Sequence, residues 1–333
     1  FPDTRETTRS IYAQTEWLSD QWSITPGVRL DHFALNVTSQ DFFYPPAKQA
    51  GQSLADSAVS PKLGVKWNAN AQWSAFAQYA EGFKAPNANQ VNGYFELSPV
   101  PGNPNYVTIV ANPQLQAERS KNLELGMRYR TPGLVLDAAI FSGEFNQLIQ
   151  DLKALGGTGL INDPLRFQTV NIDHARISGF EVKGMRDLGL IEGGRLKMPF
   201  AYGQAKGHNT SNQLPLNSID PSHFMLGLNY SKNDWDFKLD MHHFAAKRSQ
   251  DIDSASLLKN GVAQFSVPSS NTLNASAQWQ LQKQTRLTAA VYNLTQEKYW
   301  KWSDVQGVAA NSTVLDAFTQ PGRFVRFTLT TDF

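Results

Sequence analysis

The sequence predicts an all-β fold, a transmembrane antiparallel β-barrel built from long hairpin-linked strands. Three observations support this prediction: apolar and polar residues alternate repeatedly, several predicted strands are unusually long, and short and long connections alternate. The clearest alternation lies near the C-terminus, where Val325, Phe327 and Leu329 share one face of a predicted strand. Arg326 and Thr328 fall on the other face, as expected for a strand between lipid and a polar interior.

The composition excludes several other classes of protein. A formal net charge of +1 over 333 residues gives no basic field for nucleic acid. The lack of cysteine excludes disulfide frameworks, thiolate zinc sites and cysteine nucleophiles. No run of about 18 apolar residues is present, so a helical membrane span is excluded. The mean hydropathy of −0.39 still fits a transmembrane barrel, because alternating strands average to a hydrophilic value.

About thirteen strands are expected along the chain. Several of them reach the roughly 9–11 residues that a tilted strand needs to cross a bilayer, against a typical length of about 5–6 in globular proteins. In order, they are expected near 8–18, 22–37, 58–67, 73–82, 120–130, 134–152, 167–187, 195–207, 223–231, 235–245, 272–281, 285–295 and 322–333.

The connections between these strands alternate in length without a break. Outer-membrane barrels have tight periplasmic turns and long extracellular loops, whereas a soluble sandwich has no reason to keep its long loops on one side. The short connections are 19–21, 68–72, 131–133, 188–194, 232–234 and 282–284. The long ones are 38–57, 83–119, 153–166, 208–222, 246–271 and 296–321.

The order of the connections also predicts that the barrel is incomplete. The first connection is short, so the first strand runs inwards, and the last strand also ends in the periplasm, which requires an odd number of strands. Single-chain bacterial barrels have even numbers of strands. We therefore expect residues 1–333 to form one domain, the C-terminal portion of a larger barrel, with two open edges.

Tryptophan is expected to mark the membrane boundary, because aromatic girdles flank the lipid-facing band of such barrels. Six tryptophans lie at predicted strand ends: Trp17, Trp22, Trp67, Trp73, Trp235 and Trp279. Trp300 and Trp302 lie instead in a long loop, where they are candidates for contact with a ligand.

Three motifs make the chain resemble TonB-dependent outer-membrane receptors, specifically the haem and haemoglobin branch. Residues 81–86 (EGFKAP) and 112–120 (NPQLQAERS) resemble the FRAP and NPNL–ER/ES pattern of that branch. Residues 170–181 (VNIDHARISGFE) are similar to a strand found across the family, and 291–294 (VYNL), Tyr299 and Phe333 resemble its C-terminal signal. The residues matching the first pattern are Phe83, Ala85, Pro86, Asn112, Pro113, Leu115 and Glu118.

The resemblance implies a 22-stranded barrel with a plugged lumen, of which this chain holds about the last thirteen strands. The plug, the TonB box and the first strands are expected to lie outside it. Haem would be imported as cargo, directly or from a haem-carrying protein, by TonB acting through the plug in a Gram-negative outer membrane. The alternatives are a ferric-siderophore receptor, a passive channel and a purely binding or structural surface protein. The sequence contains none of four common catalytic or nucleotide-binding motifs: GxSxG, HExxH, the P-loop, and GxGxxG between a strand and a helix. We therefore expect neither an enzyme nor a catalytic cofactor.

Departures from the family pattern leave the haem ligand open. Lys84 replaces arginine and Gln114 replaces asparagine, and residues 87–111 contain no histidine. Tyr94 is the candidate ligand of haem iron, because a phenolate binds ferric haem, and Phe95 is placed to stack on the porphyrin. Alternatively, Tyr94 packs beneath neighbouring prolines or contacts a protein partner.

Histidines supply further candidates near the extracellular rim. By alternation, His242 faces the lumen and His243 faces outwards. His242 is a candidate haem ligand, or alternatively an interfacial polar residue. His208 and His223 flank one loop and are a second candidate pair, or alternatively ordinary solvated loop histidines. His174 and His32 are not expected to be surface ligands.

Charged residues lie at both ends of the largest loop. Lys84 is a candidate partner for a haem propionate, because a point cation suits a carboxylate. Alternatively, Glu81, Lys84, Glu118 and Arg119 cross-link the two ends of the loop. Pro86 and Pro113 are expected to brace those ends, where each removes a donor from the strand ladder.

Overall fold

The computed structural model describes residues 2–39, 51–99, 105–253 and 263–332. Within them, thirteen strands follow one another in a single antiparallel path, which confirms the all-β prediction and the predicted strand order. The strands are β1 (Asp3–Gln14), β3 (Trp22–Ser39), β4 (Leu54–Asn68), β5 (Trp73–Lys84), β8 (Glu118–Thr131), β9 (Leu134–Gly156), β10 (Leu165–Ile191), β11 (Gly194–Asn209), β12 (His223–Lys232), β13 (Trp235–Phe244), β14 (Ser270–Gln282), β15 (Thr285–Tyr292) and β16 (Phe324–Thr331).

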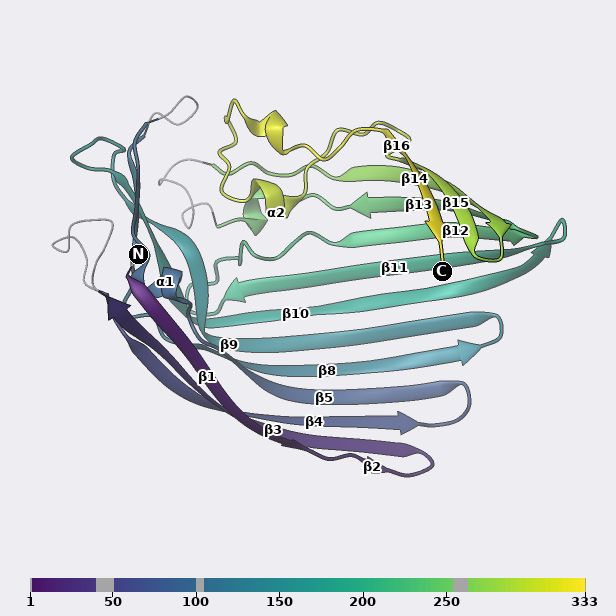
Figure 1. Ribbon diagram of the computed structural model, residues 1–333, viewed down its shortest axis with the longest axis horizontal. Coiled ribbons are helices and arrows are strands. Elements are labelled where there is room, and N and C mark those ends of the chain that lie inside the picture. Colours follow the sequence, from purple (N-terminus) through teal and green to yellow (C-terminus); the bar gives the residue numbers. More distant parts are fainter. Residues whose placement is uncertain (1, 40–50, 100–104, 254–262, 333) are drawn as a thin grey trace.

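The sheet curves into an open trough rather than a closed barrel (Figure 1). Its tight turns gather at the right of the view and its long connections at the left. Among the described residues, β1 and β16 are the two ends of the path and do not pair with each other, as expected. No helix in this part of the chain is long and apolar enough to cross a membrane. Phe333, part of the expected C-terminal signal, lies outside the described residues.

Three strands lie off the main path, and none of them was predicted as a separate strand. β2 (Trp17–Leu18) pairs with β3, while β6 (Phe95–Leu97) pairs with β7 (Val107–Val110), which adds in parallel to the start of β10. The predicted first strand is present, but its predicted bounds 8–18 were wrong, because β1 begins at Asp3 and ends at Gln14. Opposite this break lies Pro26, whose carbonyl accepts from Thr15 N but whose nitrogen has no hydrogen to donate.

The last hairpin also starts its loop earlier than predicted. β15 ends at Tyr292, and not at 295, because Asn293 adopts a positive φ of 50°. The Asn293 side chain then holds the loop, accepting from Glu297 N and donating to the carbonyls of Glu297 and Pro321. A left-handed asparagine that bonds its own loop in this way ends a strand.

Alternation gives the sheet one lipid-facing and one polar face. Leu125, Ile140 and Phe180 align across β8, β9 and β10 on the outer face and are 42%, 57% and 41% exposed. The outward-facing side of a transmembrane strand carries apolar side chains that the rest of the protein does not cover, because they contact lipid. The inner face carries ion pairs instead: Arg29 with Asp31, Arg128 with Asp137, and Arg195 with Asp187.

The predicted aromatic girdle is present at the turn end of the sheet. Three ring pairs join neighbouring strands, with ring centres 4.5 to 5.8 Å apart: Trp22 with Trp67, Trp73 with Tyr129, and Trp235 with Trp279. Their five tryptophans are exposed, and Tyr129 is half-buried. Rings with an apolar body and a polar edge favour the boundary between lipid and water.

The long connections near the C-terminus pack into a small hydrophobic body, called the loop core here. It consists of Ile252, Val267, Trp302 and Val305. Its short helices in the described residues are η2 (Ser249–Asp251), α2 (Trp302–Val305) and η4 (Leu315–Phe318), while α1 (Ala88–Asn92) belongs to the largest loop, 83–119. Trp302 is 2% exposed, so the expectation that it contacts a ligand was wrong. Trp300 donates to the Leu315 carbonyl and packs edge-on against Phe265.

Candidate functional site

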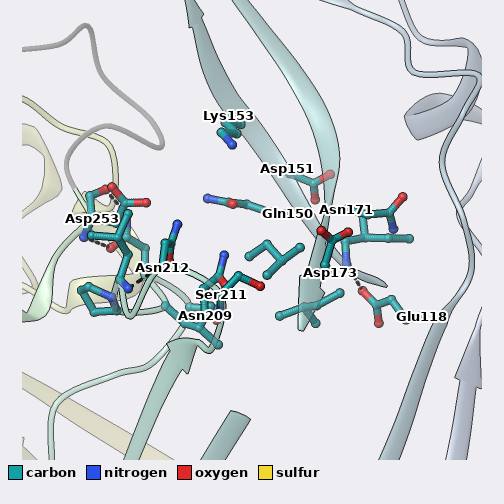
Figure 2. Close-up of a pocket in the computed structure, with 18 of the residues that line it drawn as sticks. Glu118, Gln150, Asp151, Lys153, Asn171, Asp173, Asn209, Ser211, Asn212 and Asp253 are labelled. Atoms are coloured by element: carbon teal, nitrogen blue, oxygen red, sulfur yellow. Dashed lines mark hydrogen bonds between the residues drawn. The ribbon is translucent and has the colours of Figure 1, made fainter. Parts of the chain in front are cut away.

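A polar hollow of about 620 Å³ opens on the inner side of the sheet, where β9 ends and β10 begins. Segment 209–218 forms its opposite wall. Figure 2 shows Asp173 and Asn171 on one side of the hollow and Asn209, Ser211 and Asn212 on the other. The volume lies within the usual range for small-molecule sites, about 300–1,000 Å³, but the lining is rich in amides and carboxylates rather than apolar groups.

Lys84 and Glu118 border this hollow and form an ion pair. They face each other across β5 and β8, with Lys84 Nζ 3.2 Å from Glu118 Oε1. The same Glu118 oxygen accepts a hydrogen bond from Ile149 N at 2.9 Å. Glu118 therefore joins three strands, while the Lys84 side chain remains 62% exposed toward the hollow.

The cross-link expected at the base of the largest loop, 83–119, is formed in part by other partners. Arg119 pairs with Asp56 at 3.1 Å and lies over the Phe83 ring. Glu81 accepts a hydrogen bond from the Tyr79 hydroxyl instead of pairing with Arg119. This arrangement still fixes the ends of the loop.

Glu118 borders the hollow, whereas several of the other motif residues anchor the largest loop, 83–119. Pro86 is fully buried, and Asn87 follows it as the N-cap of α1 in a capping box with Gln90. Asn112 donates to the Thr169 carbonyl and accepts from Gln114 N. Leu115, three residues after Asn112, is buried at 2% exposure. Ala85 is half-buried, and Pro113 is exposed.

Tyr94 and Phe95 lie beside the hairpin formed by β6 and β7. The Tyr94 hydroxyl donates a short hydrogen bond to Glu96 Oε1. Phe95 opposes Ile109 on β7 and is 45% exposed. Because β7 extends the sheet next to β10, this hairpin is three strands away from β13, which carries His242.

The structure brings His242 together with His223, a pairing that was not predicted. His223 Nε2 lies 3.0 Å from His242 Nδ1, and the two rings stack with centres 5.2 Å apart. Phe244 stacks on His223 at 4.5 Å, and Tyr299 stacks on Phe244 at 5.8 Å. We call these four residues the imidazole–aromatic stack. Burial raises the pKa of the Tyr299 hydroxyl above its ordinary value.

The faces of the histidines follow the predicted alternation. His242 opposes Met225 on the inner face, and its neighbour His243 faces outwards, where its Nδ1 lies 2.8 Å from Asn271 Oδ1. The proposed pairing of His208 with His223 was wrong, since His223 opposes Gly203, five residues before His208 on β11. Five residues span about 17 Å of strand.

His208 faces outwards as well, opposite Arg176 on β10. His174 and His32 also lie on this outer face, and each bonds its cross-strand neighbour, Asn146 and Ser57 respectively. None of these three therefore points towards the inner hollow.

The comparisons with known proteins identify the family. The family model described as "TonB dependent receptor-like, beta-barrel" matches residues 1–294. The chain belongs to the TonB-dependent receptor β-barrel family. As a member of that family, this barrel lies in the outer membrane of a Gram-negative bacterium. The family consists of receptors and transporters.

Curated relatives of this receptor barrel include haemoglobin and haem utilisation proteins. The chain is 25% identical over 353 residues to the "Hemoglobin-haptoglobin utilization protein B" of Neisseria meningitidis serogroup C, covering 95% of this chain and 42% of the relative. It is 24% identical over 338 residues to the "Heme/hemopexin utilization protein C" of Haemophilus influenzae, covering 91% of this chain and 43% of the relative. The chain thus spans less than half the length of these relatives.

Solved structures share the fold of this receptor barrel. It superposes on the "Copper transporter OprC" with a TM-score of 0.79 at 16% identity, covering 99% of this chain and 49% of the other. The "FrpB iron transporter from Neisseria meningitidis (F3-3 variant)" gives a TM-score of 0.70 at 15% identity, with 99% and 46% covered. At these identities the likeness concerns the fold alone.

The proximity of His223 and His242 in the imidazole–aromatic stack could have been predicted from the sequence, through the register of β12 against β13. A tight turn joins β12 and β13, and its closing pair is Lys232 and Trp235. Counting back from that pair sets His223 opposite Phe244, and so two positions from the level of His242 on the same face. Tyr299 gave no such signal, because its loop reaches Phe244 only through tertiary packing.

Proposed function

We propose that the receptor containing this chain imports haem across the outer membrane, directly or from a haem-carrying protein. The observation that carries the proposal is the imidazole–aromatic stack on the inner face. Flat aromatic and imidazole rings offer stacking surface to a porphyrin, and imidazole is a ligand of haem iron. The names of the curated relatives, which refer to haemoglobin–haptoglobin and hemopexin, support the same cargo.

Each candidate residue has a distinct role in this proposal. His242 Nε2 is the iron-binding atom of the stack, since its Nδ1 faces His223. Tyr94 is a second iron ligand closer to the outside, and its hydrogen bond to Glu96 polarises the phenol towards the phenolate that binds ferric iron. Phe95 stacks on the porphyrin, and Lys84 at the border of the hollow meets a propionate.

Transport in this proposal requires no covalent chemistry and no catalytic cofactor. Cargo binding favours one conformation of the whole receptor, and TonB acts on its plug to release the cargo inwards. The chain contributes the outer binding surface, because the candidate residues all lie at the loop end of the strands.

Haem titration of the complete receptor tests the proposal. We expect the Soret band of added haem to shift on binding. His242→Ala and Tyr94→Ala should each raise the Kd for haem at least ten-fold, which corresponds to a loss of about 1.4 kcal/mol of binding free energy from the missing iron ligand. His243→Ala is the matched control, since it is the next residue on the same strand but faces outwards. Unchanged haem affinity in both His242→Ala and Tyr94→Ala would remove these two ligands.

A ferric siderophore is the second candidate cargo, and the polar lining of the hollow favours it. Amides and carboxylates suit a hydrophilic chelate better than a porphyrin face. Uptake assays with haem, haemoglobin and a ferric siderophore in parallel distinguish the cargos. Binding of the siderophore alone would reject haem, and non-saturable uptake in cells lacking TonB would identify a passive channel.

A further inference from the structure

The ring of His242 makes one hydrogen bond within the described residues, and its partner is the ring of His223. His223 Nε2 lies 3.0 Å from His242 Nδ1, a normal length for a bond in which one nitrogen donates and the other accepts. The ring planes are 8° apart and the ring centres 5.2 Å apart, so the two nitrogens lie on the edges that face each other. One proton between these nitrogens therefore links the two imidazoles.

The position of this proton decides whether His242 can bind a metal ion. A neutral imidazole has one donor nitrogen and one acceptor nitrogen. If His242 Nδ1 donates, its Nε2 keeps a free lone pair. If His223 Nε2 donates instead, the proton of His242 has to sit on Nε2, where it blocks that lone pair. Only the first arrangement lets His242 Nε2 bind haem iron.

We propose that His223 is a positioning residue for the iron ligand. Its Nε2 accepts the hydrogen bond from Nδ1 of His242, which leaves the Nε2 lone pair of His242 directed at the cargo. A histidine that binds a metal usually donates its other N–H to an acceptor, which fixes the tautomer and raises the basicity of the binding nitrogen. This inference rests on the proposed function, because it concerns the same ligand, and His223 acts through His242 rather than on the cargo.

The rest of the imidazole–aromatic stack holds the acceptor ring in place. Phe244 opposes His223 across β12 and β13, and its ring lies flat against the imidazole, with centres 4.5 Å and planes 6° apart. Tyr299 covers Phe244 in turn, with centres 5.8 Å and planes 17° apart. Tyr299 belongs to the connection after β15, which also carries Trp302 of the loop core. The orientation of the iron ligand is therefore linked to the packing of the loops.

Nitrogen NMR of the complete, cargo-free receptor with ¹⁵N-labelled histidine tests the direction of the hydrogen bond. The spectra are recorded at a pH of about 8.5, where an ordinary imidazole is neutral. We expect Nδ1 of His242 to carry the proton and its Nε2 to be unprotonated. The signals of His242 are identified by their loss in His242→Gln.

Two variants of His223 separate its acceptor from its flat ring. His223→Phe keeps a ring against Phe244 but offers no acceptor, so the form of His242 with a proton on Nε2 should appear. His223→Gln has no ring, but its side-chain carbonyl is an acceptor and should preserve the form with a proton on Nδ1.

Haem binding by the same variants measures the consequence for the cargo. Loss of the partner of a metal-binding histidine typically costs 10- to 100-fold in affinity, so His223→Phe should raise the Kd for haem by about that factor. His223→Gln should restore most of the affinity. The iron–histidine stretching frequency of the reduced, haem-loaded receptor should fall in His223→Phe, because the ligand nitrogen becomes less basic.

His243→Phe is the matched control. His243 is the next residue on β13 and faces outwards, where its Nδ1 lies 2.8 Å from Asn271 Oδ1. The same substitution there should change neither the tautomer of His242 nor the affinity for haem. Heat-dependent migration of the folded barrel in gels confirms that each variant is folded.

Three outcomes would overturn the proposal. The first is a proton on His242 Nε2 in the unchanged receptor, and the second is a proton on Nδ1 that persists in full in His223→Phe. The third is a loss of haem affinity as large in His223→Gln as in His223→Phe. The first two outcomes require no haem. If His242→Ala left haem affinity unchanged, His242 would be rejected as the iron ligand, while the nitrogen spectra would still decide which histidine donates.

Discussion

Lys247 Nζ lies 5.1 Å from the centre of the Trp302 ring and donates a hydrogen bond to the Ile219 carbonyl at 2.6 Å. Lys247 is 5% exposed, so this ammonium group is held inside the loops. The contact joins three connections: the one after β13, the one between β11 and β12, and the one after β15. A buried cation that satisfies a carbonyl and an indole face fixes these loops relative to each other.

The stability of this loop body should rise with pH in the alkaline range. Burial lowers the pKa of Lys247 below its ordinary value of 10.5, and Asp251 and Asp220 partly offset the effect. Between that lowered pKa and 10.5 the unfolded loops bind more protons than the folded ones, so raising the pH favours the folded form. Hydrogen-exchange protection of residues 245–253, corrected for intrinsic rates, measures the slope. Lys247→Met should abolish this rise of protection with pH. Protection that falls with rising pH in the unchanged receptor would contradict the lowered pKa of Lys247.

Trp302→Ala should open the loop body while leaving the barrel intact. The substitution removes the largest side chain of the loop core and the donor to the Asn217 carbonyl, a bond of 2.6 Å. Truncating a buried tryptophan costs about 3–5 kcal/mol. Limited proteolysis should cleave the loops faster, with the strand signal in circular dichroism unchanged. Trp279→Ala, on the lipid-facing girdle, is the control and should not alter loop cleavage.

Asn171→Ala should release the C-terminal end of the largest loop, 83–119. The Asn171 side chain accepts from Gln116 N and donates to the carbonyls of Gln116 and Gln147. Leaving these groups without partners costs about 1–3 kcal/mol. Hydrogen exchange at Gln116 should quicken accordingly. Asn146→Ala removes an amide from the outer face of the neighbouring strand, and equal effects of the two variants would show that Asn171 is not the anchor.

Two substitutions at Glu118 should separate its ion pair from its hydrogen bond. Glu118→Gln keeps an acceptor for Ile149 N but loses the charge that pairs with the exposed Lys84, so it should cost at most about 1 kcal/mol. Glu118→Ala removes the acceptor too and should cost about 1–3 kcal/mol. Exchange at the Ile149 amide distinguishes them. A larger effect of the Gln variant would mean that the ion pair dominates.

The barrel strands were predictable because lipid on one side and a polar interior on the other impose a period of two. Val325, Phe327 and Leu329 show this pattern plainly, and β16 holds them on one face. The segments 95–97 and 107–110 are too short to carry a pattern, so β6 and β7 were missed. The break after Gln14 required knowing that Pro26 lay opposite.

The candidate site was less predictable, because its geometry depends on side chains brought together by register and loop packing. His242 was placed on the correct face by alternation alone, but its partner His223 needed the register of β12 against β13. Trp302 was wrongly predicted as a candidate for ligand contact, since the sequence of a loop tryptophan does not reveal the core that surrounds it. Tyr94 remains a predicted ligand.

The order of the strands also bears on how the barrel assembles. Along the thirteen-strand path, each strand pairs with the next one on the path, so the sheet can form hairpin by hairpin. The contact between Trp302 and Asn217 instead joins residues 85 positions apart. Closing so long a segment costs more chain entropy before any contact compensates for it. We therefore expect the sheet to form first and the loop body last, which makes the loops the region that adapts while the membrane-embedded wall is already set.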